Sequence, residues 1–309
     1  LWDNEKPARA LDSAARCGLG SPGIAHMWHM PGHIYSKLKR YHDSAWQQEA
    51  SARVDHAHMM RDRVLPDQIH NFAHNNEWLT RNLNHLGRAN DAMALARNMI
   101  ELPRHPKYNS LAKPDAPTEY GKRGSARYGR MRLLETLLRY EMWDEIIRAS
   151  QTVYLEETTI PEEQAKRLAA IGVAHYALGQ AEKGIKTLAK LDELKHRLED
   201  MKLEAGAKAG EDARAGEKND KETKKAKADA MKPFDGRIKT INQYRAELLA
   251  HQAATDEDGD EFNKQIAKAG KMSRERKSQL HLQVGNKKEA EKLASQSARA
   301  EGQVQPLAN

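Results

Sequence analysis

A short phrase recurs along this chain: an apolar helical stripe ends at a Gly, three or four residues follow, and a small residue then lies inside a second apolar stripe. The phrase occupies residues 85–92, 177–184 and 283–290. A Gly commonly ends a helix, and a small residue lets the next helix press closely against the one before it. The phrase therefore predicts helix pairs packed back to back, with turns near Lys39, Gly87, Glu141, Gly179 and Gly285.

The composition favours an elongated helical array over a compact domain with one core. Of the 309 residues, 39% are hydrophobic, 31% are charged and 6% are aromatic, a polar balance that suits a repeat structure with much surface for its volume. Runs of Val, Ile and Thr that alternate with polar residues are almost absent, so few segments are suited to form β-strands. We expect an all-α fold.

The recurring phrase resembles the tetratricopeptide-repeat (TPR) family, whose unit of about 34 residues is a helix-turn-helix pair. Trp28, Gly32 and Tyr35 fall at the fourth, eighth and eleventh places of a first helix, where that family prefers these residues. Residues 29–35 are similar to a His-Met-Pro-x-His-Ile segment of a bacterial TPR subfamily. The resemblance implies a TPR-like α-solenoid over residues 1–181 and degenerate helix pairs over 250–309. Pro31 predicts a kink or a restart in the first of these helices.

A helical hairpin is expected to project from the array at residues 182–249. Residues 182–205 and 234–249 should be its antiparallel partners, because each carries an apolar stripe at heptad-like spacing. Residues 206–232 contain mostly Ala, Gly, Lys, Glu and Asp, with little to bury, and predict a mobile tip. The stripes consist of Leu191, Leu194, Leu198 and Met201 on the first helix and Phe234, Ile238, Ile241, Tyr244 and Leu248 on the second.

Several classes of protein are disfavoured by what the sequence contains. No phosphate-binding loop, dinucleotide fingerprint, nucleophile elbow or zinc-protease helix is found, which lowers the expectation of a self-contained enzyme. The single Cys17 excludes an internal disulfide, and no stretch approaches the roughly 20 apolar residues of a membrane span. The net charge is +7, and Lys is concentrated in the predicted low-complexity tip, so nucleic-acid binding is not favoured.

The chain begins at Leu1, and its last residues, 303–309, resemble a segment that precedes a further helix. We therefore expect a piece of a longer protein, and the sequence does not distinguish the bacterial cytoplasm from the periplasm. Residues 104–124 carry no periodicity and predict a long loop of functional interest.

Histidines gather in the first quarter of the chain, and the TPR resemblance places several of them on one surface. It implies that the second, fifth, ninth and twelfth places of each first helix line a concave groove. The candidate groove residues are His26, His29, His33, His74, Glu77, Arg81 and Asn84.

Three interpretations of this histidine cluster remain open. The groove could hold an acidic or carboxylate-bearing segment of a partner protein. Alternatively, His26, His29, His33 and His74 could bind a transition metal, with Glu77 as an oxygen ligand. The histidines could also be structural, hydrogen-bonded within the core. Trp28, Trp46, Trp78 and Trp143 are interpreted as core between helices.

The function that the sequence favours is that of a protein-interaction or scaffold module, which binds a partner segment in the groove without a resident cofactor. One alternative is a metal-binding or metal-assisted module centred on the histidines. Another is an accessory array of a thioredoxin-like redox protein.

Overall fold

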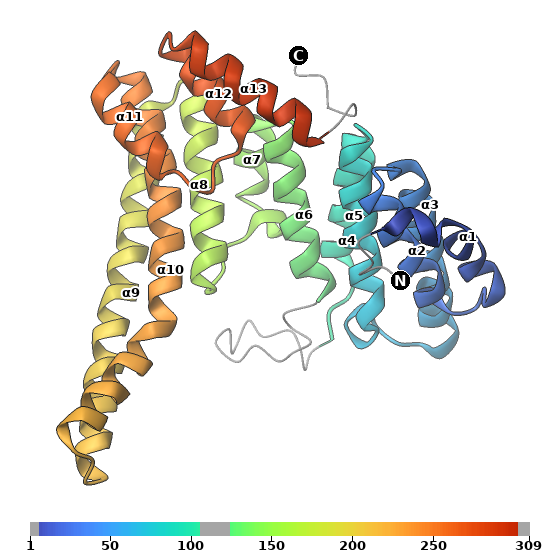
Figure 1. The fold of residues 1–309 in the computed structure, drawn as a ribbon, viewed down its shortest axis with the longest axis horizontal. Coiled ribbons are helices and arrows are strands. Elements are labelled where there is room, and N and C mark those ends of the chain that lie inside the picture. The colour runs from blue at the N-terminus through green and yellow to red at the C-terminus, as the bar shows by residue number, and fades with distance from the viewer. Residues whose placement is uncertain (1–5, 106–123, 302–309) are drawn as a thin grey trace. The chain divides into compact units, whose positions relative to one another are not determined.

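The computed structural model describes residues 6–105 and 124–301, and within these ranges it contains thirteen α-helices and no strand (Figure 1). The all-α prediction is confirmed. The greater part of the predicted long loop, residues 106–123, and the chain end from 302 to 309 lie outside the described residues.

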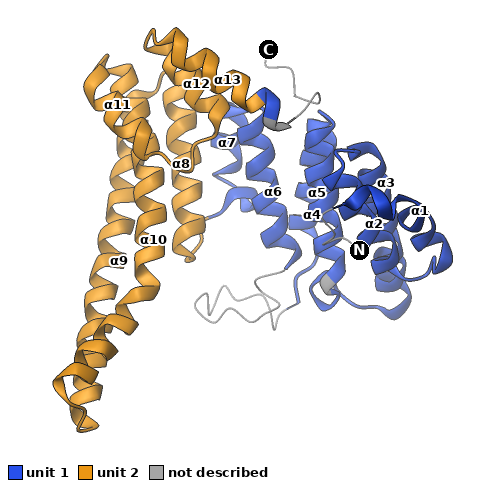
Figure 2. Cartoon of the chain, viewed as in Figure 1, with its two compact units in different colours: residues 1–156, 298–309 blue, residues 157–297 orange. Residues whose placement is uncertain are grey.

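The chain divides into two compact units (Figure 2), residues 1–156 with 298–309, and residues 157–297. The helices of the first unit are α1 (Leu11–Gly20), α2 (Ala25–Lys37), α3 (Tyr41–Asp62), α4 (His70–His85), α5 (Ala89–Glu101), α6 (Ser125–Arg139) and α7 (Trp143–Ala149), with short 3₁₀ turns at Pro7–Ala10, Pro66–Gln68 and Val153–Leu155. The second unit holds α8 (Pro161–Ala177), α9 (Ala181–Ala215), α10 (Asp220–Thr255), α11 (Gly259–Lys268), α12 (Arg274–Gln283) and most of α13 (Lys287–Glu301).

The five predicted turns share one backbone geometry. Lys39, Gly87, Glu141, Gly179 and Gly285 all have positive φ, between 54° and 80°. In each turn the following amide reaches back to a carbonyl five residues earlier, as Arg88 does to Leu83 at 3.0 Å. This pattern closes the last helical turn and satisfies carbonyls that the helix leaves unbonded. The next helix begins two residues after the left-handed residue, which makes each of these turns a tight link between paired helices.

Small residues lie at the closest contacts between paired helices, as the recurring phrase predicts. Ala92 is fully buried, in a cluster with Ala45, Leu79 and Leu83, and Ala290 is 4% exposed. A side chain added at Gly184 would collide with the ring of Tyr176. The register in which the helices pair is therefore set by positions that tolerate no larger residue.

The helix α2 does not restart at Pro31. It runs without a break from Ala25 to Lys37 with Pro31 buried inside it, so the predicted restart is wrong, whereas a kink stays a prediction. A proline removes only the bond that its own amide would have made to residue 27. The helix is supported from α3, where Ser44 donates to the carbonyl of Gly32 at 2.8 Å and Ser51 donates to that of Ala25 at 2.7 Å.

The helices α9 and α10 form the expected antiparallel hairpin, but both continue through the predicted tip. The helices are joined by a short turn at residues 216–219, which ends at Asn219, the side-chain cap of α10. Gly206 lies against Met231, and Gly210 against Lys227, so glycines let the backbones approach where no apolar stripe remains. Whether this tip is mobile stays a prediction. Although these helices are long, no helix in the described residues is apolar enough to cross a membrane.

The tryptophans do not all belong to the core. Trp28 is 9% exposed and donates from Nε1 to the carbonyl of Pro22 at 3.0 Å, whereas Trp46 is 56% exposed. The two rings meet edge to face with their centroids 5.5 Å apart. The interpretation of Trp46 as core is therefore wrong, because its position on α3 faces outward from the helix pair.

We predict that Ala92→Leu destabilises the chain by about 1–3 kcal/mol, because the added atoms have no space between α4 and α5. The denaturation midpoint in urea measures this change. Ala94→Leu is the matched control, since Ala94 is exposed on the same helix and should shift the free energy of unfolding by less than about 0.5 kcal/mol. Equal shifts for the two variants would contradict the helix register described above.

A second prediction concerns acid stability. His251 is buried in α10 against the ring of Tyr176, and its Nε2 has no hydrogen-bond partner in the described residues. Burial, together with the charge of Arg276, lowers the pKa of His251 to about 3 from its usual 6.5. Since the unfolded chain binds the proton first, stability falls as the pH drops below 6.5, and the loss from this residue at pH 5 is about 2 kcal/mol.

The variant His251→Phe should remove this part of the acid sensitivity while keeping the ring stack. Urea denaturation at pH 7 and pH 5 measures the effect, and the variant should lose less stability than the parent between these pH values. His196→Phe, at an exposed position on α9, is the control and should behave like the parent. An unchanged pH dependence in His251→Phe would refute the assignment.

Candidate metal centre

Three histidines from two helices meet inside the first unit. His29 and His33 are one turn apart on α2, so their side chains leave the same face of the helix. His74 comes from α4, and its ring centroid lies 4.7 Å from that of His29 and 6.3 Å from that of His33. One ring nitrogen from each of the three lies within 4.8 Å of the others. We call His29, His33 and His74 the histidine triad.

Hydrogen bonds from Gln48, outside the triad, fix the orientation of the His29 ring. Nδ1 of His29 lies 2.7 Å from Oε1 of Gln48, and the amide group of Gln48 donates back to the carbonyl of His29 at 3.2 Å. Because an amide oxygen can only accept, Nδ1 of His29 carries the proton and Nε2 has the lone pair. Nε2 of His33 lies 2.7 Å from this nitrogen and donates to it.

The absence of a side chain at Gly32 makes this arrangement possible. A Cβ at that position would collide with the amide group of Gln48. Gln48 itself is fully buried, and its neighbours on the same face of α3, Ser44 and Ser51, are equally buried and bonded to backbone carbonyls of α2. The helices α2 and α3 are thus joined by a polar stripe that ends at the triad.

Burial keeps His29 and His33 uncharged near neutral pH. Desolvation, together with repulsion from His33 and His74, lowers the pKa of His29 to about 3. Desolvation and repulsion from His74 lower the pKa of His33 to about 4, against the attraction of Glu77. A neutral imidazole is the form that ligates a metal, so no proton has to leave these two residues before binding.

Glu77 lies beside the triad but is committed to other partners. Its Oε1 is 3.3 Å from Nδ1 of His74, and its Oε2 accepts from Nε of Arg132 on α6 at 2.7 Å. Burial alone would raise the pKa of Glu77, but His74 and Arg132 outweigh that effect and hold the pKa below its usual range. Glu77 therefore orients His74 from outside the triad, and the prediction that it supplies an oxygen ligand is not favoured by this geometry.

The remaining predicted groove residues separate into exposed and buried ones. His26 is exposed and stacks on His29, with the ring planes 16° apart and the centroids separated by 5.9 Å. Arg81 is partly exposed and lies over the ring of Trp78. Asn84 is 1% exposed and donates to Thr136 of α6 at 2.9 Å. Asn84 and Glu77 thus pack helix against helix and do not line an open surface.

Two residues of the site were missed by the sequence reasoning. The role of Gln48 could have been found in the sequence, since Ser44, Gln48 and Ser51 recur at helical spacing on the face of α3 that should be buried. A polar stripe on a buried face indicates that the opposite helix offers hydrogen-bond partners. No local sequence pattern indicates the role of Arg132, because it contacts Glu77 across 55 positions of sequence.

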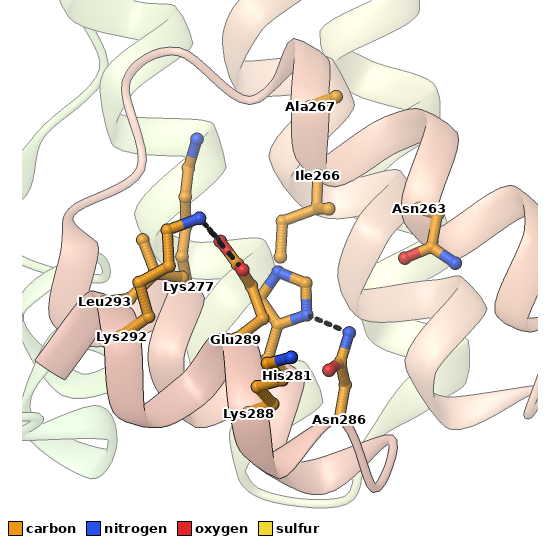
Figure 3. Close-up of a pocket in the computed structure, with 10 residues that line it drawn as sticks. All are labelled: Asn263, Ile266, Ala267, Lys277, His281, Asn286, Lys288, Glu289, Lys292 and Leu293. Atoms are coloured by element: carbon orange, nitrogen blue, oxygen red, sulfur yellow. Dashed lines mark hydrogen bonds and ion pairs between the residues drawn. The ribbon is translucent and has the colours of Figure 1, made fainter.

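A larger pocket in the second unit is less suited to specific chemistry. It has a volume of about 710 Å³ and lies between α11, α12 and α13 (Figure 3). Among its polar groups, Lys292 pairs with Glu289 at 3.0 Å, and Nδ1 of His281 lies 3.4 Å from the side-chain amide of Asn286. They do not converge on a common point as the triad does.

No family model, no curated protein and no solved structure matches this chain. The resemblance to TPR proteins therefore stays a prediction from the sequence.

Proposed function

We propose that this chain binds a divalent transition-metal ion, zinc fitting best, through His29, His33 and His74. The observation that supports the proposal is the convergence of three ring nitrogens, with the outer nitrogen of His29 beside Gln48 and that of His74 beside Glu77. Histidines that ligate metals usually carry such an outer partner, which turns the other ring nitrogen inward. Three imidazoles with one open position form a familiar zinc site.

The distances require only a small adjustment on binding. Nitrogen ligands around a tetrahedral zinc ion, at bonds of about 2.1 Å, are about 3.4 Å apart. Nε2 of His29 and Nε2 of His33 are 2.7 Å apart, joined by one proton, and the widest separation within the triad is below 4.8 Å. For Nε2 of His33 to ligate the ion, its proton would move to Nδ1 of the same ring, so that the ring stays neutral; the rings of His29 and His33 would move slightly apart and His74 would be drawn inward. The ion would also link α2 to α4, so binding should stabilise the first unit.

We expect the purified chain, freed of metal and then titrated with zinc in a calorimeter, to bind one equivalent. His33→Ala and His74→Gln should each weaken this binding by at least about 100-fold, because each variant removes one of only three protein ligands. Zinc should raise the melting temperature of the parent chain but not of these variants. His42→Ala is the control, since His42 is exposed on α3 away from the triad, and it should bind zinc like the parent.

Circular dichroism establishes that each variant has kept its helices. A folded parent chain that takes up no stoichiometric zinc, or a His42→Ala variant as impaired as His74→Gln, would contradict the proposal.

A second candidate function, binding of a partner protein, is favoured by a different surface from the predicted groove. Leu19, Ile24 and Trp46 are 68%, 55% and 56% exposed, and Trp46 packs against Trp28. Leu19 follows Gly18, which lies against the Trp28 ring, Ile24 precedes Trp28 by one helical turn, and Trp46 contacts it directly. We call this set the Trp28 patch. Clustered exposed apolar residues that include a tryptophan are typical of protein interfaces, and an apolar partner segment would suit this one.

A photo-crosslinking amino acid in place of Trp46 tests this second candidate in the source cell. We expect a single recurrent cross-linked protein that is absent when the same amino acid replaces the exposed Glu49 on the same helix. That protein, once purified, should bind Trp46→Ser at least about tenfold more weakly than the parent, because the patch would lose its most exposed aromatic ring. His33→Ala should bind it normally. Equal cross-linking from both positions would refute a role for the patch.

A further inference from the structure

The proposed metal centre has a charge that its own ligands do not balance. All three members of the triad are imidazoles, which bind a metal as neutral ligands. A divalent ion there would keep its full double charge, and in four-coordinate geometry it would have one position left over. The nearest carboxylate, Glu77, is held by Arg132, and pulling it onto the ion would take from that buried guanidinium one of its two carboxylate partners.

The side of the triad that faces solvent follows from burial. His29 is 2% exposed and His33 is 8% exposed, and His29 is backed by Gln48 from α3. The side chain of His74 is 30% exposed, and His26, stacked on His29, is exposed. A ligand from outside the chain would therefore approach the ion past His26 and His74.

A cation without a carboxylate partner lies on the α4 side of the triad. The guanidinium of Arg81 is 4.7 Å from the ring centroid of Trp78, and the Trp78 ring meets His33 edge to face at 4.3 Å. The positive charge of Arg81 acts on His33, whose pKa it helps to lower. Arg81 forms no ion pair with a carboxylate of the described residues, whereas Arg88 on the next helix pairs with Asp91 at 2.6 Å.

We infer that the bound ion and Arg81 together hold a carboxylate that comes from outside the chain. This inference rests on the proposed metal binding and names the ligand class of that site. A carboxylate offers one oxygen to the ion and presents a planar acceptor to the guanidinium fork, which matches both neighbours. The Trp78 ring provides an apolar wall for the body to which the carboxylate is attached. The opening would thus select an anion with a small organic group over a neutral molecule.

Cobalt tests the inference because its visible absorption reports on ligands at the open position. The full chain is loaded with one equivalent of Co²⁺ and titrated with acetate, N-acetylglycine, acetamide and inorganic phosphate. We expect acetate and N-acetylglycine to change the spectrum in a saturable way and acetamide to have no effect. A preference of tenfold or more for N-acetylglycine over acetate assigns the carboxylate to a chain end, and similar affinities assign it to a small molecule.

The variant Arg81→Gln separates the anion site from the metal site. It should bind Co²⁺ within about threefold of the parent and acetate at least tenfold more weakly. Arg53→Gln is the control, since Arg53 is exposed on α3 and pairs with Glu49, and it should leave both affinities unchanged.

The outcomes distinguish this inference from the proposed function. A parent chain that does not bind Co²⁺ refutes the metal centre itself. A chain that binds Co²⁺ but shows no spectral response to carboxylates refutes only the present inference. Phosphate binding tenfold tighter than acetate, or acetate binding unaffected by Arg81→Gln, overturns the assignment of a carboxylate held by Arg81.

Discussion

The contact between Gly32 and Gln48 determines most of what the first unit can do. It brings α2 and α3 close enough for a glutamine side chain to bond both the ring and the backbone carbonyl of His29. That pair of bonds fixes which nitrogen of His29 carries the proton, and hence which nitrogen faces His33 and His74. A larger residue at position 32 would displace Gln48 and release the His29 ring. The close packing of two helices is thus a precondition of the triad.

A polar interior of this kind is costly unless its groups are fully bonded. Gln48, Ser44 and Ser51 all have partners on α2, so their burial costs little. The triad differs, because three imidazole rings face one another. Burial prevents the rings of His29 and His33 from gaining a proton at neutral pH. A buried polar network is most stable when every member is satisfied. Under the proposed function, a metal ion would accept a lone pair from each of the three rings at once.

The sequence predicted the helix pairs well because their determinants are local. A helix end with a left-handed residue and a small residue at the next contact are both visible within eight positions, so the five turns and the burial of Ala92 are confirmed. The continuity of α2 through Pro31 was not predictable, since it depends on hydrogen bonds from α3. The helical tip of the α9–α10 hairpin was missed for a similar reason: Gly206 and Gly210 read as flexible in isolation but serve as contact points opposite a second helix.

The candidate site was predicted in part. Helical spacing placed His29 and His33 together, and the repeat register brought His74 to them, but the same register treated Glu77 and Asn84 as exposed groove residues. Their partners Arg132 and Thr136 belong to α6, more than fifty positions away, and no local pattern reveals such a contact. Burial therefore divides the predicted groove into an interior triad and an outer rim of His26 and Arg81.

A series of side-chain contacts links the triad to α6. His74 lies against Glu77, Glu77 accepts from Arg132, and Arg132 also pairs with Glu135 of its own helix. An ion that draws His74 toward α2 would change the environment of Glu77, because the two side chains share one contact at 3.3 Å. Since Glu77 is buried, it cannot exchange Arg132 for water without a large penalty. Glu77 therefore lies between the triad and α6, in addition to the direct contact of Asn84 with Thr136, and under the proposed metal binding it would act as a connection between them and not as a ligand.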